Sequence, residues 1–301
     1  GFKAQIPLEV WSHLKQEEEV EVTTEAEETT ERKYTVYALL VGVDRYKEFP
    51  NLRGCTKDVQ AWLRYLSNND NILDGVGVRY KAIADPTKEE LVQGIRTHLG
   101  QAQEGDIAFL FFAGYGGKEG AGQAWRNISA DRALNVIYCR DSGVEKGQTP
   151  LADKEIQYLL KEVAQNDPLI ITLFDTSYGQ SRISPFNYDG NAYLARAINQ
   201  LRPPRDWRDF IFGEEIEEDA DVVERFFSQS SYRHINLGLA TGEFALEGLE
   251  GGVLTQAIMS IMQGERGEIP YEGLIPMVNG WLKGFYDDER LHAVSQFAMI
   301  K

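Results

Sequence analysis

Three runs of apolar residues are too long and too continuous to be strands with one solvent-exposed face. They lie within residues 34–46 (YTVYALLVGVDRY), 107–113 (IAFLFFA) and 168–175 (PLIITLFD). Strands buried on both faces are typical of parallel sheets that helices cover on each side. Between the runs the sequence predicts amphipathic helices over 54–67 and 85–102, the second with a Thr87–Glu90 capping box. Because strands and helices alternate, we expect an α/β fold: a three-layer sandwich with a mostly parallel central sheet of about six strands and helices on both faces.

Composition divides the chain into three segments. Residues 1–15 carry several large apolar side chains, and we expect them to dock on the domain or on a neighbouring one. Residues 16–33 are rich in Glu and Thr, so we interpret them as an acidic, flexible linker, with an exposed edge strand at VEVTT as the alternative. A compact domain is predicted over residues 34–301. It has a regular part (34–180), a looser region of loops and helices (181–232) and a second regular part (233–301).

The overall charge excludes one class of partner. The net charge is −16, from 31 Lys and Arg against 47 Asp and Glu, and no basic cluster offsets it, so we expect no nucleic-acid binding. Two cysteines form neither a disulfide framework nor a zinc pattern. We therefore expect a reducing, cytoplasmic compartment, and a protein without a metal or other cofactor. No apolar run reaches membrane-spanning length. Because the chain begins with Gly and not Met, we expect further domains in a longer parent protein.

Two of the predicted strands end in turns of the kind that carry catalytic residues. FFAGYGG (111–117) places Tyr115 between glycines, and LIITLFDTSYG (169–179) places Asp175 two residues before Ser177. Open α/β sheets have their sites at the carboxyl ends of strands. We therefore expect Tyr115 and Ser177 to lie at the carboxyl ends of neighbouring strands.

Five stretches follow one family pattern in order: an apolar strand, an LRGC-x-x-D turn, the two strand tips and a Gly-rich stretch before a helix. They are residues 39–42, 52–58, 111–116, 175–178 and 240–258. From about Tyr37 to the C-terminus the chain thus resembles the caspase-like peptidases, and within them the metacaspases and bacterial orthocaspases. The resemblance implies a caspase-like fold, with 34–180 as a large-subunit-like part, 181–232 as a loop or insert region and 233–301 as a small-subunit-like part.

Both catalytic positions of that family are changed here. Tyr115 stands at the histidine position and Ser177 at the cysteine position. A bacterial subgroup of orthocaspase-like sequences carries this pair and is regarded as inactive, so the resemblance implies a pseudo-protease that binds, regulates or serves as a scaffold. The chemistry agrees, because a serine hydroxyl must lose its proton to a base, and a phenol with a pKa of about 10 is a poor base at neutral pH.

Two active alternatives remain open. One is a serine-type peptidase or hydrolase that uses Ser177 with another base. The other is an Arg/Lys-specific cysteine peptidase captured as an engineered Ser177 mutant, although tyrosine would be an unusual replacement for its histidine. We interpret the remaining candidate bases and nucleophiles as structural or exposed groups. They are His13, His98, His234, His292, Lys118, Cys55 and Cys139.

Two carboxylates match positions that bind the substrate's Arg or Lys in metacaspases. These are Asp58 and Asp175, and the resemblance implies that they form an acidic pocket for a protein or basic peptide. In the alternative reading, Asp175 caps a turn and Asp58 lies on a solvated helix face. If the pocket is kept, the chain itself offers arginines to fill it, and the candidates are Arg182, Arg202 and Arg205. A dimer is also compatible with a scaffold role.

Overall fold

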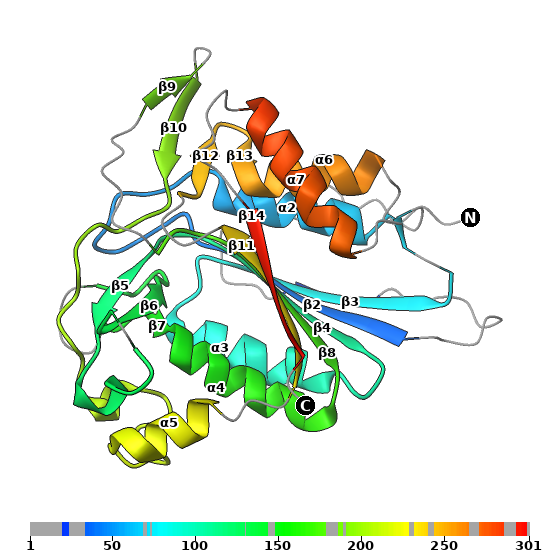
Figure 1. Ribbon diagram of the computed structural model, residues 1–301. Helices are drawn as coiled ribbons and strands as arrows, with labels where there is room; N and C mark the ends of the chain where they lie inside the picture. The colour runs from blue at the N-terminus through cyan, green and yellow to red at the C-terminus, as the bar shows by residue number, and fades with distance from the viewer. Residues whose placement is uncertain are drawn as a thin grey trace.

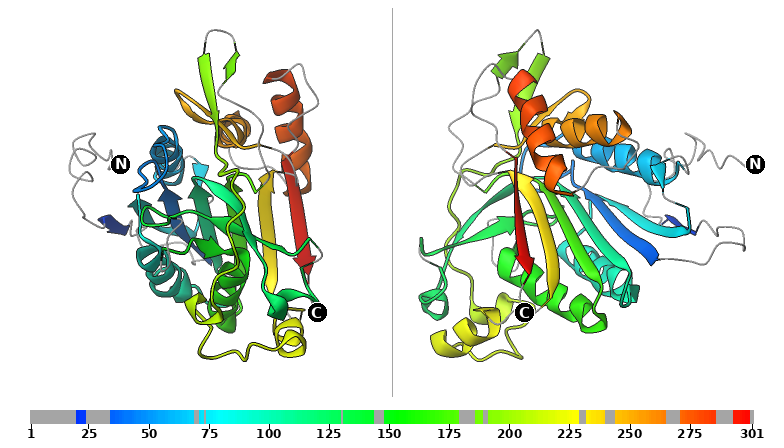
Figure 2. Two further views of the ribbon diagram at one scale, coloured as in Figure 1. Left: turned by 90° about the vertical axis from the view of Figure 1, so that its left-hand side faces the viewer. Right: turned by 45° about the vertical axis from the view of Figure 1, so that its right-hand side comes forward.

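The computed structural model contains a seven-stranded central sheet in the order β1-β3-β2-β4-β8-β11-β14 (Figure 1). It describes residues 20–23, 34–68, 71–72, 74–129, 131–143, 148–178, 186–188, 191–228, 232–239, 244–264, 271–285 and 293–299. Five adjacent strands run parallel: β3 (Val76–Ala84), β2 (Tyr34–Gly42), β4 (Ile107–Ala113), β8 (Leu169–Asp175) and β11 (Arg233–Leu239). The edges, β1 (Val20–Thr23) and β14 (Ala293–Met299), are antiparallel to their neighbours, and Figure 2 shows β14 beside β11.

Helices cover both faces of this sheet (Figure 1). On one face lie α2 (Cys55–Leu66), α6 (Val253–Gly264) and α7 (Tyr271–Phe285); on the other lie α3 (Lys88–Thr97) and α4 (Asp153–Val163). The predicted capping box of α3 is present, since Thr87 Oγ1 accepts the Glu90 N–H and the Glu90 carboxylate accepts the Thr87 N–H. The expected three-layer α/β sandwich is confirmed, with one strand more than the six expected.

The region expected to be loops and helices is more ordered than its sequence indicated. A hairpin, β9 (Phe186–Tyr188) and β10 (Asn191–Ala195), joins β12 (Leu246–Gly248) and β13 (Gly251–Gly252) in a four-stranded sheet.

A three-stranded sheet contains β5 (Gly116–Gly120), β6 (Ala133–Ile137) and β7 (Leu151–Ala152). The remaining elements are α5 (Ala220–Ser228) and four short 3-10 helices: η2 (Leu99–Gln101), η3 (Gln123–Trp125), η4 (Ala164–Asn166) and η5 (Trp207–Asp209).

A cluster of aromatic side chains attaches this region to the domain. Trp125 is almost fully buried, and its ring lies 5.5 Å from Trp207 and 5.4 Å from both Phe210 and Phe227, between ring centroids. Tilted and edge-on contacts at these separations add to the gain from burial. Residues 207–227 therefore pack against the rest of the domain.

The linker expectation is wrong at residues 20–23. These residues form β1, which pairs antiparallel with β3 from Val20 opposite Ala82 to Thr23 opposite Arg79. Val and Thr favour strands, and the edge of β3 offers unpaired backbone groups to a segment of this kind. The rest of the linker, 16–19 and 24–33, and the predicted docking segment 1–15 lie outside the described residues.

Candidate functional site

The two strand tips lie side by side. β4 and β8 are hydrogen-bonded neighbours, and Ala113 lies opposite Asp175 in their register. Tyr115 and Ser177 each follow their strand by two residues, so both are at the carboxyl end of the parallel sheet, as the sequence predicted.

Tyr115 is held by a second tyrosine. Its N–H donates to Tyr46 Oη at 2.8 Å, and the two ring centroids are 4.9 Å apart. Burial, with a contribution from the nearby Glu247 carboxylate and Cys55, raises the pKa of Tyr115 to about 12. The phenol is therefore protonated at neutral pH and cannot act as a general base there.

Ser177 is engaged as a hydrogen-bond acceptor. It is 1% exposed, and its Oγ accepts the backbone N–H of Ala245 at 2.6 Å. The described histidines belong to the other end of the sheet. His98 packs edge-on against Tyr37, which pairs with the second residue of β4. His234 contacts Thr172 Oγ1 at 2.9 Å, and burial lowers its pKa to about 4.

Two other candidate groups are already paired or are neutral. Lys118 forms an ion pair with Asp131. Cys139 is fully buried, which raises the pKa of its thiol and leaves it neutral. His13 and His292 lie outside the described residues. Within the described part of the chain, then, no candidate base is placed to activate the Ser177 hydroxyl.

The two predicted acids converge on one cation, the side chain of Arg196. Asp58 comes from α2 and Asp175 from the end of β8, and the guanidinium reaches their carboxylate oxygens at 2.5 Å and 3.0 Å. A third carboxylate, Glu247 of β12, lies 3.3 Å from Arg196 Nε. All four side chains are buried, and Arg196 is 0% exposed. The acids thus form one pocket, and the chain's own arginine fills it.

The arginines that the sequence suggested as occupants have other partners or no described position. Arg202 and Arg205 both pair with Glu119, and Arg205 also contacts Glu155. Arg182 lies outside the described residues. The sequence did contain a signal for the actual occupant, because Arg196 is the charge within AYLARAI (192–198), where a solvated arginine would be out of place.

The pocket contains three carboxyl groups for one guanidinium. Burial raises the pKa of Asp58 to about 7, while the attraction of Arg196 opposes this shift and the charge of Asp175 adds to it. Burial alone would lower the pKa of Arg196, but the surrounding acids raise it, so the arginine is always charged. A proton on Asp58 reduces the excess negative charge of the cluster.

The raised pKa of Asp58 predicts that the stability of the folded protein depends on pH. The pKa of Asp58 is raised from 3.8 to about 7 in the folded protein. The folded state therefore binds the proton more tightly, and the stabilisation present below pH 4 is lost as the pH rises towards 7. We expect the free energy of unfolding of the native protein to fall relative to that of Asp58→Asn by about 1–4 kcal/mol over this window. Urea denaturation of both proteins between pH 4.5 and 7.5 measures the difference, and a constant or rising difference would contradict the assignment.

The backbone of Arg196 is fixed as firmly as its side chain. Its carbonyl oxygen accepts the N–H of Gly116 at 3.1 Å and the N–H of Ser177 at 3.2 Å, and its own N–H donates to the Ala245 carbonyl at 2.8 Å. Gly116 is required for this approach, since a Cβ there would lie 2.4 Å from the Ser177 carbonyl oxygen. Two N–H groups at the strand tips therefore share one carbonyl oxygen.

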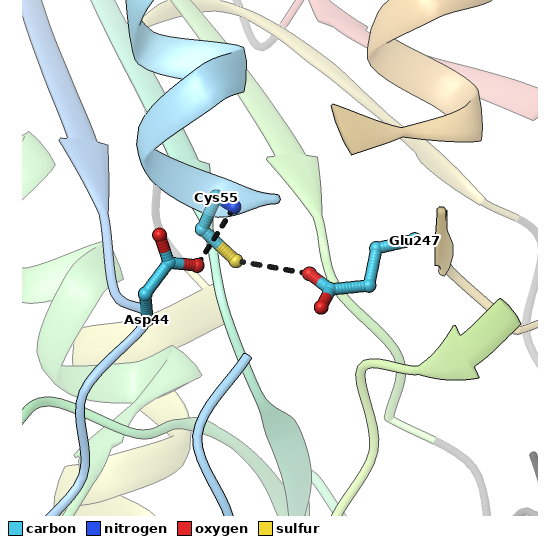
Figure 3. Close-up of side chains that lie close together, drawn as sticks. All are labelled: Asp44, Cys55 and Glu247. Carbon is cyan, nitrogen blue, oxygen red and sulfur yellow. Dashed lines mark hydrogen bonds between the residues drawn. The ribbon is translucent and has the colours of Figure 1, made fainter. Parts of the chain in front are cut away.

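Asp44, Cys55 and Glu247 gather beside the pocket, as Figure 3 shows, with ligand atoms within 4.8 Å of one another. Each carboxylate already has donors. Asp44 accepts the N–H groups of Cys55 and Thr56 at the start of α2, and Glu247 accepts those of Arg53 and Gly54. A metal ion at Glu247 would also face the Arg196 guanidinium. We therefore assign these acids to anchoring the N-terminus of α2.

Comparisons with known proteins agree with this fold. Residues 37–184 match the family model for the metacaspase, peptidase C14 domain. Metacaspase-1 of Saccharomyces cerevisiae (strain ATCC 204508 / S288c) is 22% identical over 178 residues, which cover 57% of this chain and 38% of the yeast protein. Metacaspase-1A of Aspergillus niger is 22% identical over 163 residues, covering 52% of this chain and 39% of that protein. The chain thus spans less than half the length of these curated relatives.

A solved structure is similar over most of the chain. The crystal structure of a protein from Geobacter sulfurreducens superimposes with a TM-score of 0.60 at 13% identity, covering 88% of this chain and 93% of that one. At this identity the likeness concerns the fold alone. The mostly parallel sheet with helices on both faces is consistent with a caspase-like fold. Over residues 37–184, just under half of its length, the chain is similar to the metacaspase, peptidase C14 domain.

Proposed function

We propose that this protein is a catalytically inactive caspase-like domain, a pseudo-protease that binds, regulates or serves as a scaffold. One observation carries the proposal: Ser177 follows β8 at the carboxyl end of the sheet, and its neighbour on the next strand tip, Tyr115, is a buried phenol with a pKa of about 12. Loss of a nucleophile–base unit costs several powers of ten in rate. The Tyr/Ser pair supplies neither a thiolate nor an imidazole.

The acidic pocket indicates which kind of ligand suits this domain. Asp58 and Asp175 converge on a guanidinium, so the ligand that suits the site is a protein segment or peptide with an Arg or Lys side chain. Both cysteines are free thiols, in keeping with the reducing, cytoplasmic compartment that we propose. None of the described helices is long and apolar enough to cross a bilayer. Further domains and a dimer are part of the same proposal for a scaffold.

The test is peptide hydrolysis by the purified protein, with and without calcium. We expect no release of fluorophore from Arg- or Lys-containing peptides above the buffer rate, and no labelling of Ser177 by a serine-reactive peptide probe. Ser177→Ala is the matched control, because it removes one oxygen atom and leaves the fold. Cleavage by the native protein that disappears in Ser177→Ala would show a serine-type hydrolase and overturn the proposal.

A further inference from the structure

The segment around Arg196 pairs through its backbone with both sides of the site. Before Arg196, β10 is antiparallel to β12, with Leu194 opposite Glu247 and Ala195 opposite Leu246. Figure 1 shows β10 running from the tip of its hairpin towards the carboxyl ends of the central strands. The segment is thus an added strand, the way in which many proteins bind extended peptides.

After Arg196 the same segment continues along β5. Ala197 lies opposite Gly116 and Arg202 opposite Glu119 in parallel bridges. The Ile198 N–H donates to the Gly116 carbonyl at 2.8 Å, and the Arg202 N–H donates to the Lys118 carbonyl at 3.0 Å. Residues 194–198 therefore pass over the two tips, and the chain pairs with β5 again at Arg202.

Arg196 lies at the centre of this segment, and its side chain and its backbone carbonyl are bound at two different places. Its side chain fills the acid pocket, while its carbonyl oxygen takes both N–H groups, from Gly116 and Ser177. A structural ion pair requires only the side chain. Paired backbone N–H groups aimed at one carbonyl oxygen are the arrangement by which peptidases stabilise the oxyanion formed on a peptide bond during attack.

We propose that residues 193–198 are a resident ligand, bound in cis in the position of a substrate, with the Arg196–Ala197 peptide bond where a cleaved bond would lie. The inference rests on the proposed function, because an active site would not keep such a bond intact. It also fixes the class of outside ligand, which is an extended peptide with Arg at the same position. Such a peptide binds only by displacing the resident segment.

The first test restores the dyad with Tyr115→His and Ser177→Cys in one protein. The new thiolate then attacks the Arg196 carbonyl carbon, a C–S bond forms, and the C–N bond to Ala197 breaks. The new imidazole takes the thiol proton and passes it to the departing nitrogen. Water hydrolyses the thioester and regenerates the thiol, leaving a carboxylate on Arg196 and an amine on Ala197. We expect intact mass and N-terminal sequencing to show one cut, between these two residues.

The second test requires no catalysis. Ser177→Cys introduces a thiol beneath the segment, and we expect iodoacetamide to alkylate it at least 100-fold more slowly than the thiol of Ser260→Cys, which lies at an exposed position on α6. Ile198→Pro removes the N–H that donates to the Gly116 carbonyl. In the Ser177→Cys background, Ile198→Pro should raise the labelling rate at least tenfold. In the Ser260→Cys background it should leave the rate unchanged.

Each result decides the inference. A cut after Arg196 supports it, and so does a shielded thiol that Ile198→Pro exposes, even if the restored dyad cuts nothing. Cutting at another bond, cleavage of an added Arg peptide while the chain stays intact, or labelling at 177 as fast as at 260 would overturn it. A shielded thiol that does not respond to Ile198→Pro would overturn it as well, because some other part of the protein would then cover the site. None of these variants measures native hydrolysis, so failure here is distinct from failure of the pseudo-protease proposal.

Discussion

Arg196→Met is expected to lower the free energy of unfolding by about 3–5 kcal/mol at pH 7.5, because removal of one partner leaves buried charges uncompensated. Methionine keeps most of the apolar volume of the stem, so the loss reports the guanidinium. Without it, three buried carboxyl groups face one another, and the two N–H groups at the tips lose the anchor that holds their acceptor. Urea denaturation monitored by circular dichroism measures the change.

The matched control is Arg233→Met, which removes the same group from a surface pair. Arg233 and Asp167 are 3.8 Å apart, with side chains 47% and 66% exposed. Solvent screens such a pair, and its loss should change stability by about 0–1 kcal/mol. A loss for Arg196→Met no larger than that for Arg233→Met would mean that the pocket does not depend on its arginine.

Glu155→Ala should destabilise the protein by a comparable amount, about 3–5 kcal/mol. Glu155 on α4 is 0% exposed and connects several segments. Its carboxylate accepts from Lys88 Nζ at 2.8 Å and from Arg205 at 3.0 Å. It also accepts the backbone N–H groups of Ala152 at 2.8 Å and Ile211 at 3.0 Å. Removing it leaves Lys88 without its carboxylate partner and two N–H groups without their acceptor, while Arg205 keeps Glu119.

Glu162→Ala on the same helix is the control for that experiment. Glu162 pairs with Arg96 through two hydrogen bonds, but both side chains are about one third exposed. Its removal should cost about 0–1 kcal/mol in the same denaturation assay. Equal losses for the two variants would show that burial does not distinguish the two ion pairs.

The central sheet was predictable because each buried strand is a continuous run of apolar residues in the sequence. The run in β2, the FLFF of β4 and the LIITLF of β8 are buried on both faces, and the capping box at Thr87 marks where α3 begins. β1 was predicted only as the alternative to a linker, and the β9–β10 hairpin was not predicted. They are short strands, and the pairing of β1 with β3 and of β10 with β12 joins segments that are distant in the sequence, so their sequences do not reveal their partners.

The candidate site was half visible in the sequence for a similar reason. The positions of Tyr115, Ser177, Asp58 and Asp175 followed from strand ends and from the family pattern. The identity of the cation did not, because Arg196 reaches Asp58 across 138 residues of sequence and its neighbour in the cluster, Glu247, lies 51 residues further on. Pairing over such distances depends on β10 meeting β12, which composition and periodicity do not report.

That pairing has a consequence for the order in which the molecule folds. The segment after β10 contacts β5, which is already complete when Arg196 is synthesised, whereas β12 and Ala245 come about 50 residues later. Contacts between distant parts of a chain form slowly, because a long loop must close first. The final fixing of Arg196 therefore belongs to the last steps of folding. A nascent chain passes through a period in which the pocket of Asp58 and Asp175 exists but its arginine is not yet clamped between two sheets.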